Sequence, residues 1–71
     1  MDRKAICTAI GRNIRRRRQE NGISEIALAF YLGIPLEQLQ QYENGEDSPT
    51  CDELIQAARL FCCSVDELCS D

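Results

Sequence analysis

The segment that decides the fold is SEIALAFYLGIPLEQLQQYE, residues 24–43. Ser24 suits the N-cap of a helix, because its hydroxyl can accept a hydrogen bond from a backbone N–H of the first turn. Gly33 ends that helix, since glycine adopts the left-handed conformation of a helix C-terminus at little cost. Pro35 fits the start of the next helix, where its fixed φ and missing N–H are tolerated. The segment therefore predicts two short helices joined by a tight turn.

The composition of these two helices predicts which of their sides face the interior. The first helix is dominated by apolar residues, and we expect it to be mostly buried: Ile26, Ala27, Leu28, Ala29, Phe30 and Leu32. In the second helix, Leu39 and Tyr42 mark the inward face, because residues three apart lie on one side of a helix. The side chains left to face outward are Leu36, Glu37, Gln40 and Gln41.

A long helix is predicted before this pair, over residues 2–21. Ile6, Ile10 and Ile14 recur every four residues in it, and they therefore share one face. Gly22 ends this helix in the same way as Gly33 ends the next one. The pattern predicts that the isoleucine face packs against the core.

Two further helices are predicted after the pair. Thr50 and Ser64 are each followed three residues later by a glutamate, which is the spacing of a capping box. The first box opens a fourth helix, with an apolar side made of Leu54, Ile55, Ala58 and Phe61. The second box opens a brief fifth helix over residues 65–69. With no strand pattern anywhere in the sequence, we expect an all-α protein of five helices.

The size of the chain limits what it can form. It has 71 residues, of which 44% are hydrophobic, so it can make one core and is interpreted as a single domain, residues 1–71. One core of this size supplies only about 3–5 kcal/mol, which makes a homodimer plausible. No apolar run approaches the roughly 20 residues that span a bilayer, and no signal peptide opens the chain. We therefore expect a cytoplasmic protein that does not contact membranes.

Charge is distributed unevenly along the sequence. The net charge is −4, which argues against a protein that holds DNA by bulk electrostatics alone. Residues 1–18, however, carry seven basic side chains and one acidic one, for a charge of +6, whereas residues 19–71 carry one basic and eleven acidic side chains, for −10. The two parts have opposite electrostatic characters.

The order and spacing of several short motifs point to a known family. The two helices around Gly33, with the small residue Ala29 four positions earlier, match the tight turn of a helix-turn-helix. From about Ile10 to Cys69 the chain resembles the Xre/Cro/lambda-repressor family. The motifs that carry the resemblance are Ile14-Arg15 through Arg18, Gly22-Ile23-Ser24, Leu28-Ala29, Leu32-Gly33-Ile34, Tyr42-Glu43-Asn44-Gly45, Pro49-Thr50 and Ser64-Val65-Asp66-Glu67-Leu68. The resemblance implies a lambda-repressor-like DNA-binding domain with its helix-turn-helix at about residues 24–43.

The resemblance also implies which side chains would read DNA. Leu36, Glu37 and Gln41 stand where phage repressors place base-reading side chains, with Gln38 and Gln40 nearby. Glutamine can bind adenine through two hydrogen bonds, and glutamate can accept one from cytosine. The alternative is that these residues form an ordinary solvated face of the helix.

Phosphate contacts are implied at both ends of the helix-turn-helix. They would come from Ser24 and Glu25 before it, from Asn44 after it, and from Arg12, Arg15 and Arg16 on the first helix. The alternatives are that Asn44 and the glycine after it only make a turn, and that the arginines bind an acidic protein surface. The resemblance further implies a structural salt bridge between Arg18 and Glu43.

Two departures from the family pattern concern the reading face. The family usually has glutamine where this chain has Glu25, and a carboxylate repels phosphate. Glu37 adds a second negative charge, and residues 35–43 contain no Lys or Arg. The leading hypothesis is a homodimeric, sequence-specific transcriptional regulator that binds a double-stranded DNA operator and reads the major groove with helix 35–43. The alternative is a protein-interaction module on the same fold, with weakened DNA binding and an acidic surface that binds a basic partner or mimics DNA.

The remaining chemistry of the sequence argues against an enzyme or a metal protein. The chain has five cysteines but no C-x-x-C pair and no histidine, so neither a zinc site nor an activated nucleophile is expected, and no cofactor is predicted. Most of the cysteines stand where the family has Val or Leu, and we expect small buried hydrophobes. Cys62 stands where the family often has glycine, so we expect an exposed thiol or a strained helix cap there.

Overall fold

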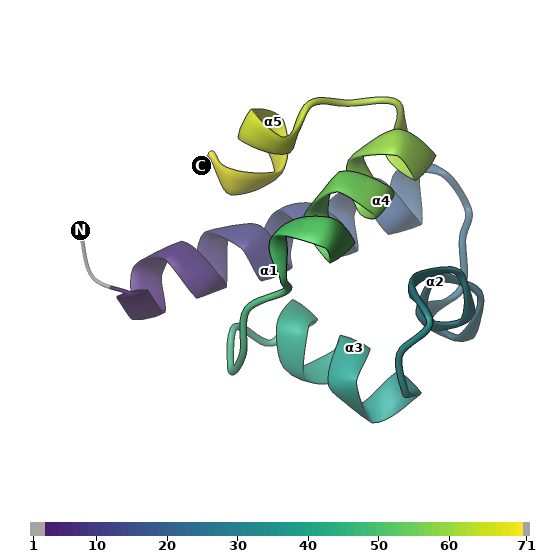
Figure 1. Cartoon of the computed structure of the whole chain (residues 1–71), viewed down its shortest axis with the longest axis horizontal. Coiled ribbons are helices and arrows are strands. Elements are labelled where there is room, and N and C mark those ends of the chain that lie inside the picture. Colours follow the sequence, from purple (N-terminus) through teal and green to yellow (C-terminus); the bar gives the residue numbers. More distant parts are fainter. Residues whose placement is uncertain (1–2, 71) are drawn as a thin grey trace.

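The computed structural model describes residues 3–70, which fold into five helices (Figure 1). Their bounds are α1 (Arg3–Glu20), α2 (Glu25–Leu32), α3 (Leu36–Glu43), α4 (Cys51–Phe61) and α5 (Val65–Cys69). No strand occurs within residues 3–70. The predicted all-α architecture of five helices is confirmed.

The helices begin and end within one residue of the predicted positions, and residue 2, the predicted start of the first helix, lies outside the described residues. Ser24 Oγ accepts from the backbone N of Ala27 at 3.1 Å, and both predicted capping boxes, Thr50 with Glu53 and Ser64 with Glu67, are formed. Gly33 has the left-handed φ of 71° that a C-cap requires. Pro35 occupies the N-cap position of α3 in an extended conformation, so the helix itself starts one residue later than predicted.

The core is built around α1, which packs against α3 and α5, while α2 packs against α3 and α4. In Figure 1, α3 and α5 lie on opposite sides of α1. The side chains with almost no exposure are Ile14, Leu28, Leu39 and Leu68. At Gly11 the backbones approach so closely that a Cβ atom would lie 2.1 Å from the carbonyl oxygen of Tyr42. Glycine at this position therefore lets α1 cross the end of α3.

The expectation that α2 is mostly buried was wrong. Leu28, Ala29 and Leu32 are buried, but Ile26 is 69% exposed and Phe30 is 88% exposed. An eight-residue helix packed on the surface of a core buries one face only, whatever the polarity of the other face.

Two other apolar residues are more exposed than predicted. Ile6 is 38% exposed because it lies one turn nearer the N-terminus of α1 than Ile10, which is buried. Ile55 is 42% exposed, since it lies at the edge of the α4 face that holds Leu54 and Ala58. These positions satisfy the helical period but lie beyond the contact with neighbouring helices.

The cysteines also differ from the expectation. Cys7 is buried and Cys63 is partly buried, but Cys51, Cys62 and Cys69 are exposed, so most of the five are not core residues. Cys51 and Cys69 lie at helix ends, where fewer neighbours cover them. Cys62 is exposed and has a left-handed φ of 55°, so both of the alternatives expected there, an exposed thiol and a strained helix cap, are present.

Candidate nucleic-acid interface

The turn between α2 and α3 fixes these helices relative to each other. The backbone N of Gly33 donates to the carbonyl of Phe30 at 3.1 Å, and the N of Ile34 donates to that of Ala29 at 3.0 Å. Both acceptors are among the last carbonyls of α2, which have no partner inside the helix. Leu28 and Leu39, both with no exposed surface, pack from the two helices into one core. The pair therefore presents the outer side of α3 as a rigid surface.

The predicted base-reading residues fall into two groups. Gln38 Nε2 donates to Asp47 Oδ2 at 2.8 Å, and Gln40 Nε2 donates to Glu25 Oε2 at 3.3 Å, so both amides are already engaged. Glu37 is exposed and Gln41 is partly exposed, and neither side chain makes a hydrogen bond or ion pair with the rest of residues 3–70. Leu36 is 37% exposed at the start of α3. Of the predicted base-reading residues, only Leu36, Glu37 and Gln41 therefore have side chains without a hydrogen-bond partner in residues 3–70.

The N-terminus of α2 carries a carboxylate whose charge is partly balanced. Glu25 Oε1 lies 3.8 Å from Arg18 Nη2, and its other oxygen accepts from Gln40. The side chain of Glu25 is 40% exposed. Ser24 is exposed beside it, with its hydroxyl used in the cap. The guanidinium of Arg18 therefore lies beside the carboxylate of Glu25, which the sequence suggested would be an isolated negative charge.

The ion pair expected between Arg18 and Glu43 is present and buried. Arg18 Nε lies 2.8 Å from Glu43 Oε2, and the two side chains are 10% and 2% exposed. Arg18 Nη2 also donates to Glu43 Oε1 at 3.3 Å, and Nη1 donates to the carbonyl of Ile23 at 3.0 Å. One guanidinium thus joins the end of α3 to the segment that leads into α2.

Arg15 extends this arrangement to the loop after α3. Its Nε lies 3.3 Å from Glu43 Oε1, and its Nη2 donates to Asn44 Oδ1 at 2.9 Å. A continuous chain of contacts therefore runs from α3 through α2 and α1 to the loop after α3: Gln40, Glu25, Arg18, Glu43, Arg15 and Asn44. Arg15 was predicted to contact phosphates, and its protein partners were not predicted. Its position one turn before Arg18 is the signal that would have suggested a shared acceptor.

Two further arginines that were predicted to contact phosphate lie at the surface of α1. Arg12 and Arg16 are exposed. Arg16 makes no hydrogen bond or ion pair within the described residues 3–70. Positive charge from α1 is therefore present beside Asn44 through Arg15 and on the open surface through Arg16.

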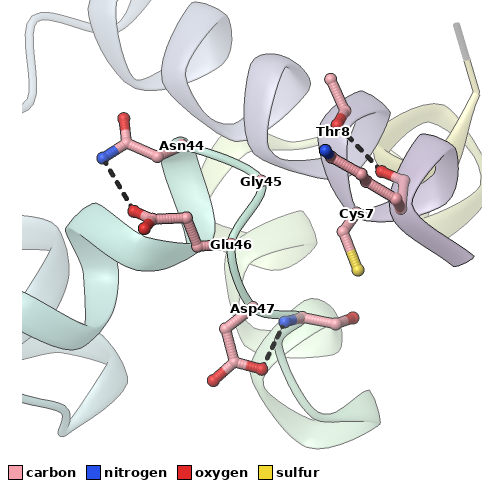
Figure 2. Close-up of a pocket in the computed structure, with 8 residues that line it drawn as sticks. Cys7, Thr8, Asn44, Gly45, Glu46 and Asp47 are labelled. Carbon is pink, nitrogen blue, oxygen red and sulfur yellow. Dashed lines mark hydrogen bonds between the residues drawn. The ribbon is translucent and has the colours of Figure 1, made fainter.

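A surface hollow that the sequence did not predict separates the start of α1 from the loop after α3 (Figure 2). Its volume is about 560 Å³, and its lining includes Lys4, Cys7, Gly45, Glu46 and Asp47. Gly45 has a φ of 77°, and a Cβ there would lie 3.0 Å from both Cα and Oγ1 of Thr8. Glycine thus lets the loop that carries Asn44 lie close against α1.

Tyr42 anchors the end of α3 to α4. Its hydroxyl donates to Glu53 Oε1 at 2.7 Å. Burial, together with the carboxylate of Glu53, raises the pKa of Tyr42 to about 12. The phenol is therefore neutral over the whole physiological range and serves as a hydrogen-bond donor.

Within residues 3–70 no group of three or more His, Cys, Asp or Glu side chains could hold a metal ion. Partial burial raises the pKa of the Cys63 thiol, and local desolvation together with the carboxylate of Asp66 raises the pKa of the Cys69 thiol, so both shifts favour the protonated form. None of the helices described in residues 3–70 has the length and apolarity needed to cross a membrane.

Comparison with known proteins identifies one relative that represses transcription. The transcriptional repressor RstR of the cryptic phage CTXphi, from Vibrio cholerae serotype O1, is 37% identical over 46 residues. The match covers 65% of this chain and 41% of RstR, so the chain spans about two fifths of that relative.

Solved structures share the fold. An HTH_3 family transcriptional regulator from Vibrio cholerae matches with a TM-score of 0.80 and 27% identity, over 94% of this chain and 38% of that one. The restriction-modification controller protein C.AhdI from Aeromonas hydrophila matches with a TM-score of 0.79 over 90% and 97% of the two chains, and its 23% identity shows the fold alone. Apo-HppE also matches, with a TM-score of 0.81 and 27% identity over 92% of this chain and 36% of its own.

A family assignment follows from the sequence as well as from the fold. Residues 14–68, which include the helix-turn-helix, α4 and all but the last residue of α5, match the model of the helix-turn-helix family HTH_3. The matched region holds both partners of the Arg18–Glu43 ion pair and the whole of α3. The chain therefore belongs to the HTH_3 helix-turn-helix family.

Proposed function

We propose that this chain is a sequence-specific, DNA-binding transcriptional regulator that places α3 in the major groove of an operator. The observation that carries the proposal is the state of Glu37 and Gln41. They lie four residues apart, and so on one face of α3, and neither has a partner within residues 3–70. Polar side chains held on a rigid helix without internal partners are suited to hydrogen bonding with base edges.

The chemistry of this face suggests a base preference. Gln41 can pair with the N6 and N7 edge of adenine, Glu37 can accept from N4 of cytosine, and Leu36 can contact the methyl group of thymine. Gln38 and Gln40 have the different task of holding α3 through Asp47 and Glu25. Only three of the five residues predicted to read bases are therefore proposed to do so.

Phosphate contacts are proposed on both sides of α3. Arg15 and Asn44 are joined by a hydrogen bond at one side, and Ser24 lies exposed at the N-terminus of α2 on the other. Arg12 and Arg16 would add positive charge from α1. Because Arg18 partly balances Glu25, this carboxylate is proposed to orient Gln40 rather than to repel DNA.

Dimerisation and location complete the proposal. Regulators of this architecture read two half-sites about one helical turn apart as homodimers. We place the protein in the cytoplasm, where a DNA-binding regulator would meet its operator.

Selection of bound sequences from a random duplex library, at low and at moderate salt, tests the proposal. We expect the retained duplexes to share a motif, and we expect Gln41→Ala to lose selectivity at one position, at a cost of about 1–3 kcal/mol. Gln56→Ala, an exposed glutamine on α4, is the matched control and should leave the selected motif unchanged. Retention of no common motif at low salt, with no effect of Gln41→Ala, would overturn DNA reading.

A second candidate is a protein-interaction module with an acidic surface. The observation that favours it is that α3 carries no Lys or Arg, while Glu37 presents an exposed carboxylate without a counter-charge. Such a surface would bind a basic partner or mimic DNA. Failure to bind any duplex, together with salt-sensitive binding to a polycation that Glu37→Gln weakens, would support this function instead.

A further inference from the structure

One face of α2 is apolar and uncovered. We call Ile26, Ala27, Phe30 and Tyr31 the α2 outer face. Ile26, Phe30 and Tyr31 are 69%, 88% and 47% exposed, and Ala27 is exposed as well. The four residues lie on the side of the helix opposite Leu28, Ala29 and Leu32, which fill the core.

The α2 outer face carries no charge, although the chain as a whole is acidic, with a net charge of −4. The nearest charge on α2 is that of Glu25, which Arg18 and Gln40 engage from the other helices. Two copies of the chain can therefore meet at this face without bringing like charges together. A strongly basic or acidic partner would find no complementary charge on it.

The exposed area is large for a chain of this size. A buried aromatic side chain removes about 150–250 Å² from water, and Phe30 is almost fully exposed next to Tyr31. With Ile26 and Ala27 added, the face offers several hundred Å² toward the roughly 800 Å² that each partner of a stable complex contributes. Monomeric proteins rarely leave a contiguous apolar patch of more than a few hundred Å² in water.

We propose that the α2 outer face is the surface through which two copies of this chain associate, with Phe30 at its centre. The contact would be isologous, because each copy presents the same apolar residues to the other. This inference rests on the homodimer of the proposed function and names its surface. None of the residues proposed to contact DNA belongs to it.

The experiment measures the mass of the full chain in solution by sedimentation, from low to high micromolar concentration. We expect the unmodified chain to dimerise and the double variant Ile26→Gln with Phe30→Gln to dimerise at least about tenfold more weakly. Glutamine keeps the net charge and favours helix, so circular dichroism should report an unchanged helix content. Ile55→Gln, at an apolar residue of α4 that is 42% exposed, is the matched control and should dimerise normally.

A second variant covers the case in which the double variant folds poorly. Ala27→Glu changes a small exposed residue, removes no packing contact, and places two like charges across the contact, so it should also prevent dimerisation. A chain that stays monomeric at high concentration, or a dimer that survives both the double variant and Ala27→Glu, would overturn this interface.

DNA binding is measured in parallel by fluorescence anisotropy with a duplex that holds one half-site of the selected motif. We expect the double variant to bind this half-site as the unmodified chain does, which supports a dimer surface separate from the reading surface. A monomeric chain that binds the duplex would remove the proposed interface and leave DNA reading in place. A dimeric chain that binds no duplex, and whose dimer the variants disrupt, would remove DNA reading and leave the interface in place.

Discussion

Replacing Glu43 with glutamine should remove most of the stability of the chain. The carboxylate of Glu43 is the acceptor for two guanidiniums, at 2.8 Å from Arg18 Nε and 3.3 Å from Arg15 Nε. Glutamine keeps the shape of the side chain but loses the charge. The substitution therefore leaves the buried guanidinium of Arg18 without its main counter-ion.

The burial of the pair sets the size of the effect. The side chains of Arg18 and Glu43 are 10% and 2% exposed, and breaking a buried pair by removing one partner costs about 3–5 kcal/mol. Glu25 lies 3.8 Å from Arg18 and compensates it in part, so we expect the lower end, about 3 kcal/mol. Because one core of this size supplies only about 3–5 kcal/mol, Glu43→Gln should keep only about 0–2 kcal/mol and be marginally stable at room temperature. In a thermal scan its Tm should fall by about 12–24 °C.

Urea unfolding followed by circular dichroism measures the difference, with two companion variants. The double variant Arg18→Met with Glu43→Leu replaces the pair by apolar groups of similar size and should recover to within about 1 kcal/mol of the unmodified chain. Arg15→Met should cost less than about 1 kcal/mol, because that side chain is 46% exposed. A stability of Glu43→Gln within about 0.5 kcal/mol of the unmodified chain would refute the reasoning. A double variant as unstable as Glu43→Gln would show that the shape of these two side chains, and not their charge, determines the loss of stability.

Three other substitutions have expected outcomes. Tyr42→Phe removes the hydrogen bond to Glu53 and should cost about 0.5–1.5 kcal/mol at neutral pH. Because the pKa of Tyr42 is raised, the stability that this hydrogen bond contributes is complete below the ordinary pKa of 10.0 and is lost as pH rises toward about 12. In unfolding curves measured at increasing pH, the difference in unfolding free energy between the unmodified chain and Tyr42→Phe should therefore shrink over that window. Cys62→Gly should raise the unfolding free energy by about 1 kcal/mol, because glycine adopts the φ of 55° without strain, and an unchanged Tm would contradict this. Gly11→Ala should destabilise by about 1–3 kcal/mol, since its Cβ would lie 2.1 Å from a backbone oxygen of α3, and a variant of unchanged stability in urea would show that α1 can shift.

The boundaries of the helices were determined by the sequence on its own. Ser24 and Gly33 act on backbone groups within three or four residues, so their effect can be deduced from the chain alone. Both capping boxes and the left-handed position of Cys62 follow the same local rules. The Arg18–Glu43 pair was also anticipated, but through the resemblance to a family and not through any local rule.

The tertiary structure alone decided which faces and which polar groups remain available. The apolar pattern of α2 did not indicate that Phe30 would lie in solvent, because exposure depends on where neighbouring helices end. The engagement of Gln40 by Glu25, and of Arg15 by Asn44, joins residues that are 15 and 29 positions apart in sequence. Such contacts depend on how α1, α2 and α3 cross, which is fixed by core packing far from the side chains concerned. Local hydrogen bonding thus determined the elements, and long-range packing determined which side chains of α3 lack a partner within residues 3–70 and which face of α2 lies exposed.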